Sequence, residues 1–306
     1  MGFPRKGVDL SDLREKEWAG TIPIYGQAWI GERMTDWEEE WRAAHQRSPV
    51  RTTPQNQGRW KDFWSQDSDY YLQESKAEAE FHEKVVERMT ETGWLRPNDA
   101  VLDVGCGPGT LALPMARRVR EVHALDEAEG MLETLRQECG RQGIVNIITL
   151  LSPWKEHSAP GTYDLVFASL SPAIRSGEDL MAMERASRDR CCLIVPCPSD
   201  TMATRNELWE MVVGEFHPSD AYSAKYPLNV LRERGRDPVS HRVTGEVEYR
   251  RPTEDVIDHY LRYFRIFTEM TPEKEERVRR HFLHRSVDGF DIGRSGKCLE
   301  LICWKV

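Results

Sequence analysis

The stretch from Val101 to Thr110, with the sequence VLDVGCGPGT, constrains the fold of this chain more than any other segment. An apolar, β-branched run ends in Asp103 and passes into a turn with glycine at every second position. Glycine permits a positive φ and lets a ligand approach the backbone without meeting a Cβ atom. The residues from Thr110 to Arg118 are expected to form a helix, whose first amides would face whatever lies over the turn. A strand, a glycine turn and a helix in this order predict a nucleotide-type site in an α/β sheet.

The spacing of the glycines restricts the kind of nucleotide. A nicotinamide or flavin fingerprint would place glycines at 105, 107 and 110, whereas position 110 is threonine and the third glycine stands at 109. Asp103 would repel a diphosphate but attract an ammonium group. A phosphate loop of the Walker type is excluded, because no Gly-Lys-Ser/Thr follows the turn.

The segment DVGCGPG at 103–109 resembles motif I of the class I S-adenosylmethionine-dependent methyltransferases, in their small-molecule, type-11-like form. The resemblance covers residues 76–198 well, the C-terminal strands weakly and the first 60 residues hardly at all. It implies S-adenosyl-L-methionine as cofactor, with its methionine and ribose portions held around Asp103, Gly105, Cys106 and Gly107. A glycine turn without a ligand and a dinucleotide site are the alternatives.

Along the chain, predicted strands alternate with predicted helices. Strands are expected at residues 100–104, 121–125, 146–151, 163–168, 191–195, 243–250 and 298–304. Helices are expected at 76–93, 110–118, 130–139 with Gly140 as the stop, 178–187, 201–213, 253–264 with Thr253 as N-cap, and 272–284. This alternation predicts an α/β fold with a doubly wound, mostly parallel, Rossmann-like sheet. The resemblance implies seven strands with an antiparallel last strand.

Four parts of the chain are expected. Residues 1–75 are an aromatic-rich extension or cap, 76–198 the cofactor-binding core, 199–241 an insertion over the substrate site, and 242–306 the C-terminal part of the core sheet. The first part holds six of the ten tryptophans, and Trp37 and Trp41 lie four apart on a short helix expected near Thr35. These rings are expected to pack this segment onto the core. An aromatic cage for a cationic or planar substrate is the alternative.

Asp126 ends the second predicted strand at the distance from Gly105 expected for an acid that binds ribose hydroxyls. A carboxylate accepts two such hydrogen bonds in a fork. Its context, DEAEGML at 126–132, resembles the family pattern D-x-S-x-x-M-L, with alanine in place of serine. The resemblance implies that Glu127 lies beside the cofactor and that Met131 packs near the adenine. An acidic N-cap without a ligand is the alternative.

The resemblance implies that three further segments contribute to the cofactor and substrate sites. Ser152 stands where the family often has an aspartate for the adenine amine, with Pro153 and Trp154 beside it. Ser169 and Ser171 belong to a half-match, Ser171-Pro172, of the family's D/N/S-P-P-aromatic motif, and are expected to line the methyl-transfer site. A plain strand-to-helix turn is the alternative there. Tyr70, or Tyr71, is expected at the cofactor or substrate through a loose match to W-D-x-x-A-x-x-Y.

S-adenosylmethionine already carries an activated methyl group on a positive sulfur. Transfer is an in-line displacement, so alignment is the main requirement, and orientation can supply roughly 7–11 kcal/mol of a barrier. No catalytic residue is assigned from the sequence. A nitrogen or hydroxyl acceptor would still lose a proton, for which His217, His241 and His259 are candidates by location.

Composition narrows the partners. The net charge of −9 weighs against a nucleic-acid surface, although basic stretches at 232–236 and 277–285 leave room for a small site for an anionic substrate. Residues 1–12 carry charges throughout and do not resemble a signal peptide, and no run of 18 apolar residues exists.

The seven cysteines lack C-x-x-C pairs, and several lie in predicted strands as small buried hydrophobes. That pattern suits a reducing cytoplasm and makes zinc improbable. The sequence thus predicts a cytoplasmic methyltransferase for a small molecule that needs no metal and has no membrane partner, with a homodimer left open. A protein or rRNA methyltransferase, and a cofactor-binding protein without turnover, are the alternatives.

Overall fold

The computed structural model describes residues 35–197, 203–216 and 218–306. The chain separates into two units, Met1–Thr35 and Asp36–Val306, and the helices and strands described lie in the second. The strands are β1 (Ala100–Val104), β2 (Glu121–Asp126), β3 (Ile147–Leu151), β4 (Tyr163–Ser169), β5 (Ser187–Pro196), β6 (Val239–Pro252) and β7 (Phe290–Lys305). The first helices are α1 (Trp37–Arg47), α2 (Gln57–Gln66), α3 (Ser68–Ala77), α4 (Ala79–Glu91), α5 (Ala112–Ala116) and α6 (Glu129–Gln142). They are followed by the 3₁₀ turn η2 (Trp154–Glu156), α7 (Gly177–Ala186), α8 (Ala203–Val212), α9 (Lys225–Glu233), α10 (Thr253–Phe264) and α11 (Pro272–Leu283).

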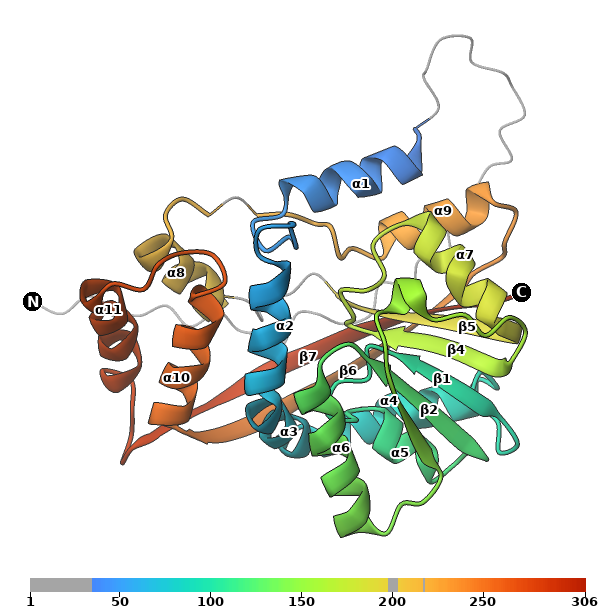
Figure 1. The fold of residues 1–306 in the computed structure, drawn as a ribbon, viewed down its shortest axis with the longest axis horizontal. Coiled ribbons are helices and arrows are strands. Elements are labelled where there is room, and N and C mark those ends of the chain that lie inside the picture. The colour runs from blue at the N-terminus through green and yellow to red at the C-terminus, as the bar shows by residue number, and fades with distance from the viewer. Residues whose placement is uncertain (1–34, 198–202, 217) are drawn as a thin grey trace, which may run out of the picture. The chain divides into compact units, whose positions relative to one another are not determined.

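The strands form one seven-stranded sheet in the order β3-β2-β1-β4-β5-β7-β6 (Figure 1). Strands β1 to β5 pair in parallel, and β7 lies antiparallel between β5 and β6. The predicted fold class, with its antiparallel last strand, is confirmed. Because parallel strands share their direction, the segments that follow β1, β2, β3 and β4 meet at one edge of the sheet.

Side chains of the central strands alternate between two cores, as the two-residue period of a strand requires. Leu102 and Val104 of β1 pack in a cluster with residues of α7 and α9, whereas Val101 packs in a second cluster with residues of α4 and α5. Both faces of the sheet are therefore covered by helices, and its central strands are apolar along their length.

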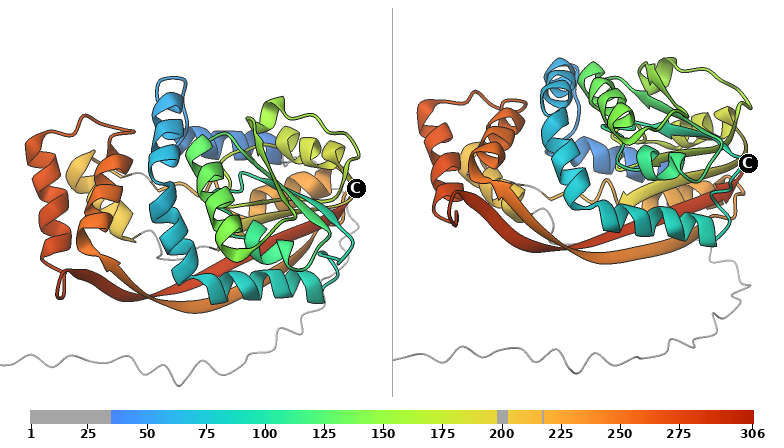
Figure 2. Two further views of the ribbon diagram at one scale, coloured as in Figure 1. Left: turned by 60° about the horizontal axis from the view of Figure 1, so that its bottom comes forward. Right: turned by 90° about the horizontal axis from the view of Figure 1, so that it is seen from below.

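The β6–β7 hairpin is longer than the sheet to which it belongs. Strand β7 pairs with β5 only over 299–305, but it pairs with β6 over 290–303. The hairpin therefore continues beyond the end of β5 and carries α10 and α11 at its far end (Figures 1 and 2). A third apolar cluster joins these two helices to α2 and α8. We call this cluster, built from residues of α2, α8, α10 and α11, the cap cluster.

Local details differ from the sequence-based expectations. The helix after the glycine turn is shorter than 110–118, and α6 runs past Gly140 to Gly143, which has φ +66°. Helix α10 begins at Thr253 itself, whose hydroxyl bonds Ser286, so Thr253 is not its N-cap. Helix α9 was not expected, because its charged residues hide a buried stripe of Tyr226, Val230 and Leu231.

Two cysteines differ from the expected buried thiols. Cys197 and Cys298 form a disulfide between the end of β5 and β7, and five other cysteines are free. The strand pairing brings the two residues together, because Pro196 is opposite Leu299. The two cysteines are 101 residues apart in the sequence, so no local pattern predicts the disulfide. No helix in the described ranges is long and apolar enough to cross a membrane.

The tryptophans of the N-terminal part that the structure describes are packed against distant segments. Trp41 is 2% exposed and donates its indole N–H to the carbonyl of Ala221 at 3.0 Å. Trp60 stacks on Trp64 at 5.6 Å within the cap cluster. These contacts agree with the packing interpretation. Trp18 and Trp29 lie outside the described residues.

Candidate functional site

The glycine turn after β1 is tied to the end of β2 by its own backbone. The amides of Gly105 and Cys106 both donate to the carbonyl of Leu125, at 2.8 and 3.0 Å. Gly105, Gly107 and Gly109 have φ of +73°, +55° and +92°, a region that side chains other than glycine rarely adopt. The alternating glycines thus produce the turn that the sequence predicted.

Gly105 also brings the turn against the segment that follows β4. A Cβ atom at this position would lie 2.2 Å from Oγ of Ser171 and 3.0 Å from its Cβ. Gly109 packs in the same way against Leu135 of α6, whereas a Cβ at Gly107 would meet nothing within 4 Å. The backbone around Gly107 is therefore open to a ligand, and Ser171 closes the site on the side of β4.

Asp126 lies beside this turn. Its two carboxylate oxygens accept from the amides of Gly107 and Ala128, each at 2.9 Å. Burial raises the pKa of the carboxyl, while the two backbone hydrogen bonds oppose that rise. Since a carboxylate offers about four lone-pair sites, it keeps capacity for two hydroxyl donors of a ligand.

Asp103 is the second acid of the site. It is 2% exposed, and burial together with the charge of Asp126 raises the pKa of its carboxyl well above the ordinary value. Among the described residues, none donates a hydrogen bond to this carboxylate. A ligand that brings a positive charge or N–H donors would favour its ionised form.

The other predicted contacts of the cofactor divide between the surface and the core. Glu127 is exposed and Met131, in the first turn of α6, is 3% exposed. The Cys106 side chain packs among Leu113, Ala124, Leu132 and Leu135, and burial raises the pKa of its thiol, so its backbone faces the turn while its sulfur belongs to the core.

The segment after β3 is placed beside Asp126. The amide of Ser152 donates to the carbonyl of Asp126 at 3.1 Å, and the Ser152 hydroxyl donates to the carbonyl of the exposed Pro153. Trp154 is 7% exposed and packs in the core cluster with Leu180 of α7. Its indole nitrogen is buried and has no partner among the described residues.

Strand β4 ends in a strained segment. Ser169 pairs with Ile194, and Leu170 follows with φ +50° although its side chain is 54% exposed. Ser171 is buried, and its hydroxyl accepts from the amide of Ala173 at 3.3 Å. An exposed leucine in the left-handed region costs energy without any gain in packing, a pattern that is typical of functional sites.

Tyr70 lies against α10. Its ring stacks on the imidazole of His259 at 4.2 Å, and burial raises the pKa of its phenol. Nδ1 of that imidazole is 2.5 Å from Oδ2 of Asp67, a fully buried carboxylate that also accepts from Arg262 at 2.7 Å. Tyr71 contacts the same imidazole at 5.9 Å.

Contacts of the α2–α3 junction link this group to α6. The carbonyl of Ser65 lies within 2.2 Å of where a Cβ of Gly130 would be, and Ser68 bonds Thr134 at 3.0 Å. Asp67 stands between these two serines, so the structure brings His259 toward the first turns of α6. His241 lies on β6 opposite Leu301, and His217 lies outside the described residues.

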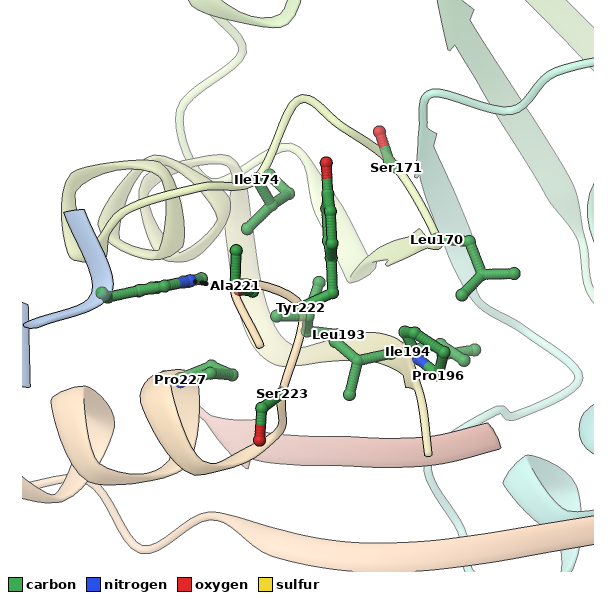
Figure 3. A pocket seen from close by; sticks show the side chains of 12 residues that line it. Leu170, Ser171, Ile174, Leu193, Ile194, Pro196, Ala221, Tyr222, Ser223 and Pro227 are labelled. Carbon is green, nitrogen blue, oxygen red and sulfur yellow. Dashed lines mark hydrogen bonds between the residues drawn. The ribbon is translucent and has the colours of Figure 1, made fainter. Parts of the chain in front are cut away.

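A pocket opens next to Ser171. It is lined by Leu170, Ser171, Ile174, residues 193–196 of β5, Trp41, and Ala221, Tyr222, Ser223 and Pro227 of the segment around α9. Figure 3 shows the Tyr222 ring standing between Ile174 and the backbone that carries Ser171. Its volume of about 20 Å³ holds roughly one water molecule, so an acceptor would have to widen it.

Sequence patterns did not point to several of these contacts. Tyr222 lies in a stretch without periodicity, and its ring contacts that of His45 on α1, far away in the sequence. The close contact between Gly130 and Ser65 was likewise not predicted from the sequence. A signal did exist in Trp37 and Trp41, whose spacing predicted a packed helix. In the part of the chain that the structure describes, no three His, Cys, Asp or Glu side chains gather as around a metal ion.

Comparisons with known proteins concern the same part of the chain. Residues 101–188 match the sequence model of the methyltransferase domain family. An uncharacterized protein of Haemophilus influenzae is 36% identical over 89 residues, which cover 28% of this chain and 33% of that protein. The nocamycin O-methyltransferase of Saccharothrix syringae is 33% identical over 99 residues, covering 31% of this chain and 35% of that protein.

A third relative acts on RNA by its name. The 23S rRNA (uracil(1939)-C(5))-methyltransferase RlmD of Alkalilimnicola ehrlichii is 28% identical over 138 residues, covering 42% of this chain and 30% of that protein. The chain thus spans about a third of the length of the curated relatives that it matches. Residues 101–188 of this chain are therefore similar to a methyltransferase domain.

Proposed function

We propose that this chain binds S-adenosyl-L-methionine at the glycine turn and transfers its methyl group to a small molecule. The observation that carries the proposal is the pair of acids around an open backbone: Asp126 beside Gly107, and Asp103 at the end of β1. Asp126 would accept the ribose hydroxyls, and Asp103 would face the positive portion of the cofactor. Glu127, Met131 and Ser152 would surround the adenine end.

The cofactor, when bound, supplies a methyl group already activated on sulfur. The chain's own residues then have to hold the acceptor in line with that group and to keep water out. Ser169 and Ser171, at the end of β4, would line this position, and the cap cluster would close it. An acidic chain with an aromatic cap favours a small acceptor over the open surface that an RNA needs.

We propose His259, among the described histidines, as the group that takes a proton from an acceptor, because Asp67 orients its imidazole. Asp67 fixes its Nδ1 and leaves Nε2 available, and Tyr70 holds the plane of the ring. We predict that His259→Asn lowers kcat by about 10²-fold, the usual size of a general-base contribution, and leaves the affinity for S-adenosylhomocysteine unchanged. An unchanged kcat, measured at saturating acceptor, would remove His259 from the mechanism.

The acceptor class is tested by incubating the purified chain with methyl-labelled S-adenosylmethionine and either a metabolite extract or ribosomal RNA. We expect label in the low-molecular-weight fraction. Label in the RNA instead would favour a nucleic-acid substrate, as in the relative of that name. Tight cofactor binding without label in any fraction, including protein, would favour a binding protein without turnover.

A further inference from the structure

The disulfide between Cys197 and Cys298 lies where two parts of the sheet separate. Strand β7 pairs with β5 over residues 299–305, whereas its residues 290–298 pair with β6 and not with β5. Cys197 and Cys298 follow the last β5–β7 pair, and the amide of Cys197 donates to the carbonyl of Cys298 at 3.1 Å. We call this point, at which the β6–β7 hairpin leaves β5, the fork.

On the core side of the fork, β5 forms one wall of the pocket beside Ser171. Residues 193–196 of β5 line that pocket, and Cys197 directly follows them (Figure 3). Pro196 has no N–H to donate, so the amide of Cys197 and the disulfide hold the last residues of β5 against β7. The position of this part of the pocket wall therefore depends on the bond to Cys298.

On the other side of the fork, the hairpin carries α10 and α11 of the cap cluster (Figure 2). Other contacts also hold this hairpin to the core. Lys297 pairs with Glu78 at 2.5 Å, and the ring of Phe81 lies 2.8 Å from where a Cβ of Gly245 would be. Because these contacts do not involve the disulfide, opening it would change the link between β5 and the hairpin and would leave the hairpin on α4.

A second pair of cysteines on the same two strands differs from the disulfide in its access to solvent. Cys192 of β5 is opposite Cys303 of β7, and their sulfurs are 3.0 Å apart. Both residues are fully buried, whereas Cys298 at the fork is half-buried. Since thiol–disulfide exchange needs direct attack on a sulfur, we expect a dissolved thiol to reach the disulfide at the fork and not the inner pair.

Opening of the disulfide is a two-electron exchange with a dithiol. The S–S bond between Cys197 and Cys298 breaks, and both sulfurs become thiols. The dithiol gives up two protons and two electrons as its own disulfide forms. In a reducing compartment such bonds are usually transient, so this one would open and close there with the supply of dithiol and of oxidising disulfide.

We infer that the Cys197–Cys298 disulfide is a redox clamp on the acceptor end of the site. The closed clamp holds the β5 wall of the pocket against the hairpin that carries α10 and α11. When the clamp opens, the end of β5 separates from β7 and methyl transfer slows, whereas the glycine turn and Asp126, which follow β1 and end β2, are unaffected. The effect on methyl transfer rests on the proposed function, and the opening of the fork does not.

The test compares the full chain before and after treatment with dithiothreitol, a dithiol. The double variant Cys197→Ser/Cys298→Ser removes the clamp, and Cys139→Ser is the matched control, because Cys139 on α6 is a half-buried free thiol. Alkylation after denaturation counts the thiols, and hydrogen–deuterium exchange reports on residues 193–197 and 298–302. Calorimetry measures the affinity for S-adenosylhomocysteine, and transfer of label from methyl-labelled S-adenosylmethionine is followed in the metabolite extract.

We expect alkylation of five cysteines in the untreated wild type and of all seven after reduction. Reduction should raise hydrogen exchange at 193–197 and 298–302 about tenfold and leave that of β1 unchanged. It should lower the melting temperature by about 10 °C and the rate of label transfer by about tenfold, with unchanged affinity for S-adenosylhomocysteine. The double variant should behave as the reduced wild type with or without dithiothreitol, and Cys139→Ser should respond to it as the wild type does.

Seven alkylated cysteines without reductant, or equal hydrogen exchange at the fork in both states, would overturn the clamp and leave the proposed function standing. An opened fork with an unchanged or higher rate of label transfer, or with a tenfold loss of S-adenosylhomocysteine affinity, would overturn its assignment to the acceptor end. If the untreated protein binds no S-adenosylhomocysteine and transfers no label, the proposed function fails, and the alkylation and exchange results still decide whether the clamp exists.

Discussion

At the scale of single residues, Gly105 satisfies two requirements at once. Glycine readily adopts its φ of +73°, which other residues rarely do, and the absence of a side chain leaves the space that Ser171 occupies. The first requirement follows from the glycine pattern, which the sequence displays. The second could not be predicted, because Ser171 comes from another strand and was placed near the site only through a half-match.

Gly105→Ala should therefore harm both folding and binding. We expect about 1–2 kcal/mol of backbone strain and a displaced Ser171, with at least a tenfold loss in S-adenosylhomocysteine affinity. Gly143→Ala is the matched control, since Gly143 also has a positive φ but open space around it. Equal cofactor affinity in Gly105→Ala and Gly143→Ala, by calorimetry, would refute the close approach as a feature of the site.

His45 makes the stability of the molecule depend on pH. Its pKa is lowered to about 4 by burial, so at pH 7 the imidazole is neutral in both states and has no effect. As the pH falls from 6.5 toward 4, the unfolded chain takes up a proton that the folded chain refuses, and stability is lost. We expect His45→Gln to abolish up to about 3 kcal/mol of that loss in urea unfolding. A variant with the wild-type slope over this range would contradict the burial of His45.

At the scale of elements, β5 is fixed to the segment before β1 by a buried arginine. Arg190 is 1% exposed and donates to Asp99 at 2.6 Å, to the carbonyl of Trp94 at 2.8 Å and to Asp189. The apolar residues that begin with Cys191 and Cys192 predicted the strand, but nothing in the sequence predicted that Arg190 would be buried. A strand can be predicted from its local pattern, whereas the partner of a buried charge depends on how the strands pair.

Arg190→Met should cost about 3–5 kcal/mol in the free energy of unfolding, because Asp99 would be left as a buried charge without its partner. The double variant Arg190→Met/Asp99→Asn should recover most of that loss. Chemical denaturation with urea measures both. A loss below about 1 kcal/mol in the single variant would mean that solvent reaches Asp99.

The elements of the sheet and the helices around it were predictable, since strands and helices alternate with clear periodicity. The position of the cap cluster was less predictable. Helices α10 and α11 were expected as helices, yet their position at the end of an overlong β6–β7 hairpin follows from fourteen paired positions, not from their own sequences. Helix α9 was not predicted because of its many charged residues. The disulfide was not predicted because 101 residues of sequence separate its two cysteines.

At the scale of the whole molecule, two distant parts of the chain lie at the candidate site. Trp41 of helix α1 lines the pocket and His45 contacts the ring of Tyr222, while the α2–α3 junction reaches α6 through Ser65 and Ser68. Motif I predicts the cofactor end of the proposed site from sequence alone. The pocket beside Ser171 is formed by segments that are far apart in the sequence, so no local pattern could predict it. The cytoplasmic location and the homodimer stay predictions.

The central claim is that the backbone of the glycine turn and Asp126 hold the nucleoside of the cofactor. Isothermal calorimetry of S-adenosylhomocysteine with the wild type and with Asp126→Ala tests it, with Glu129→Ala, an exposed acid of α6, as control. The account predicts saturable binding to the wild type and to the control, and at least a tenfold loss in Asp126→Ala, because hydrogen bonds to a charged group contribute about 1.5–3 kcal/mol. No binding at millimolar ligand, or equal affinity in all three proteins, would contradict it.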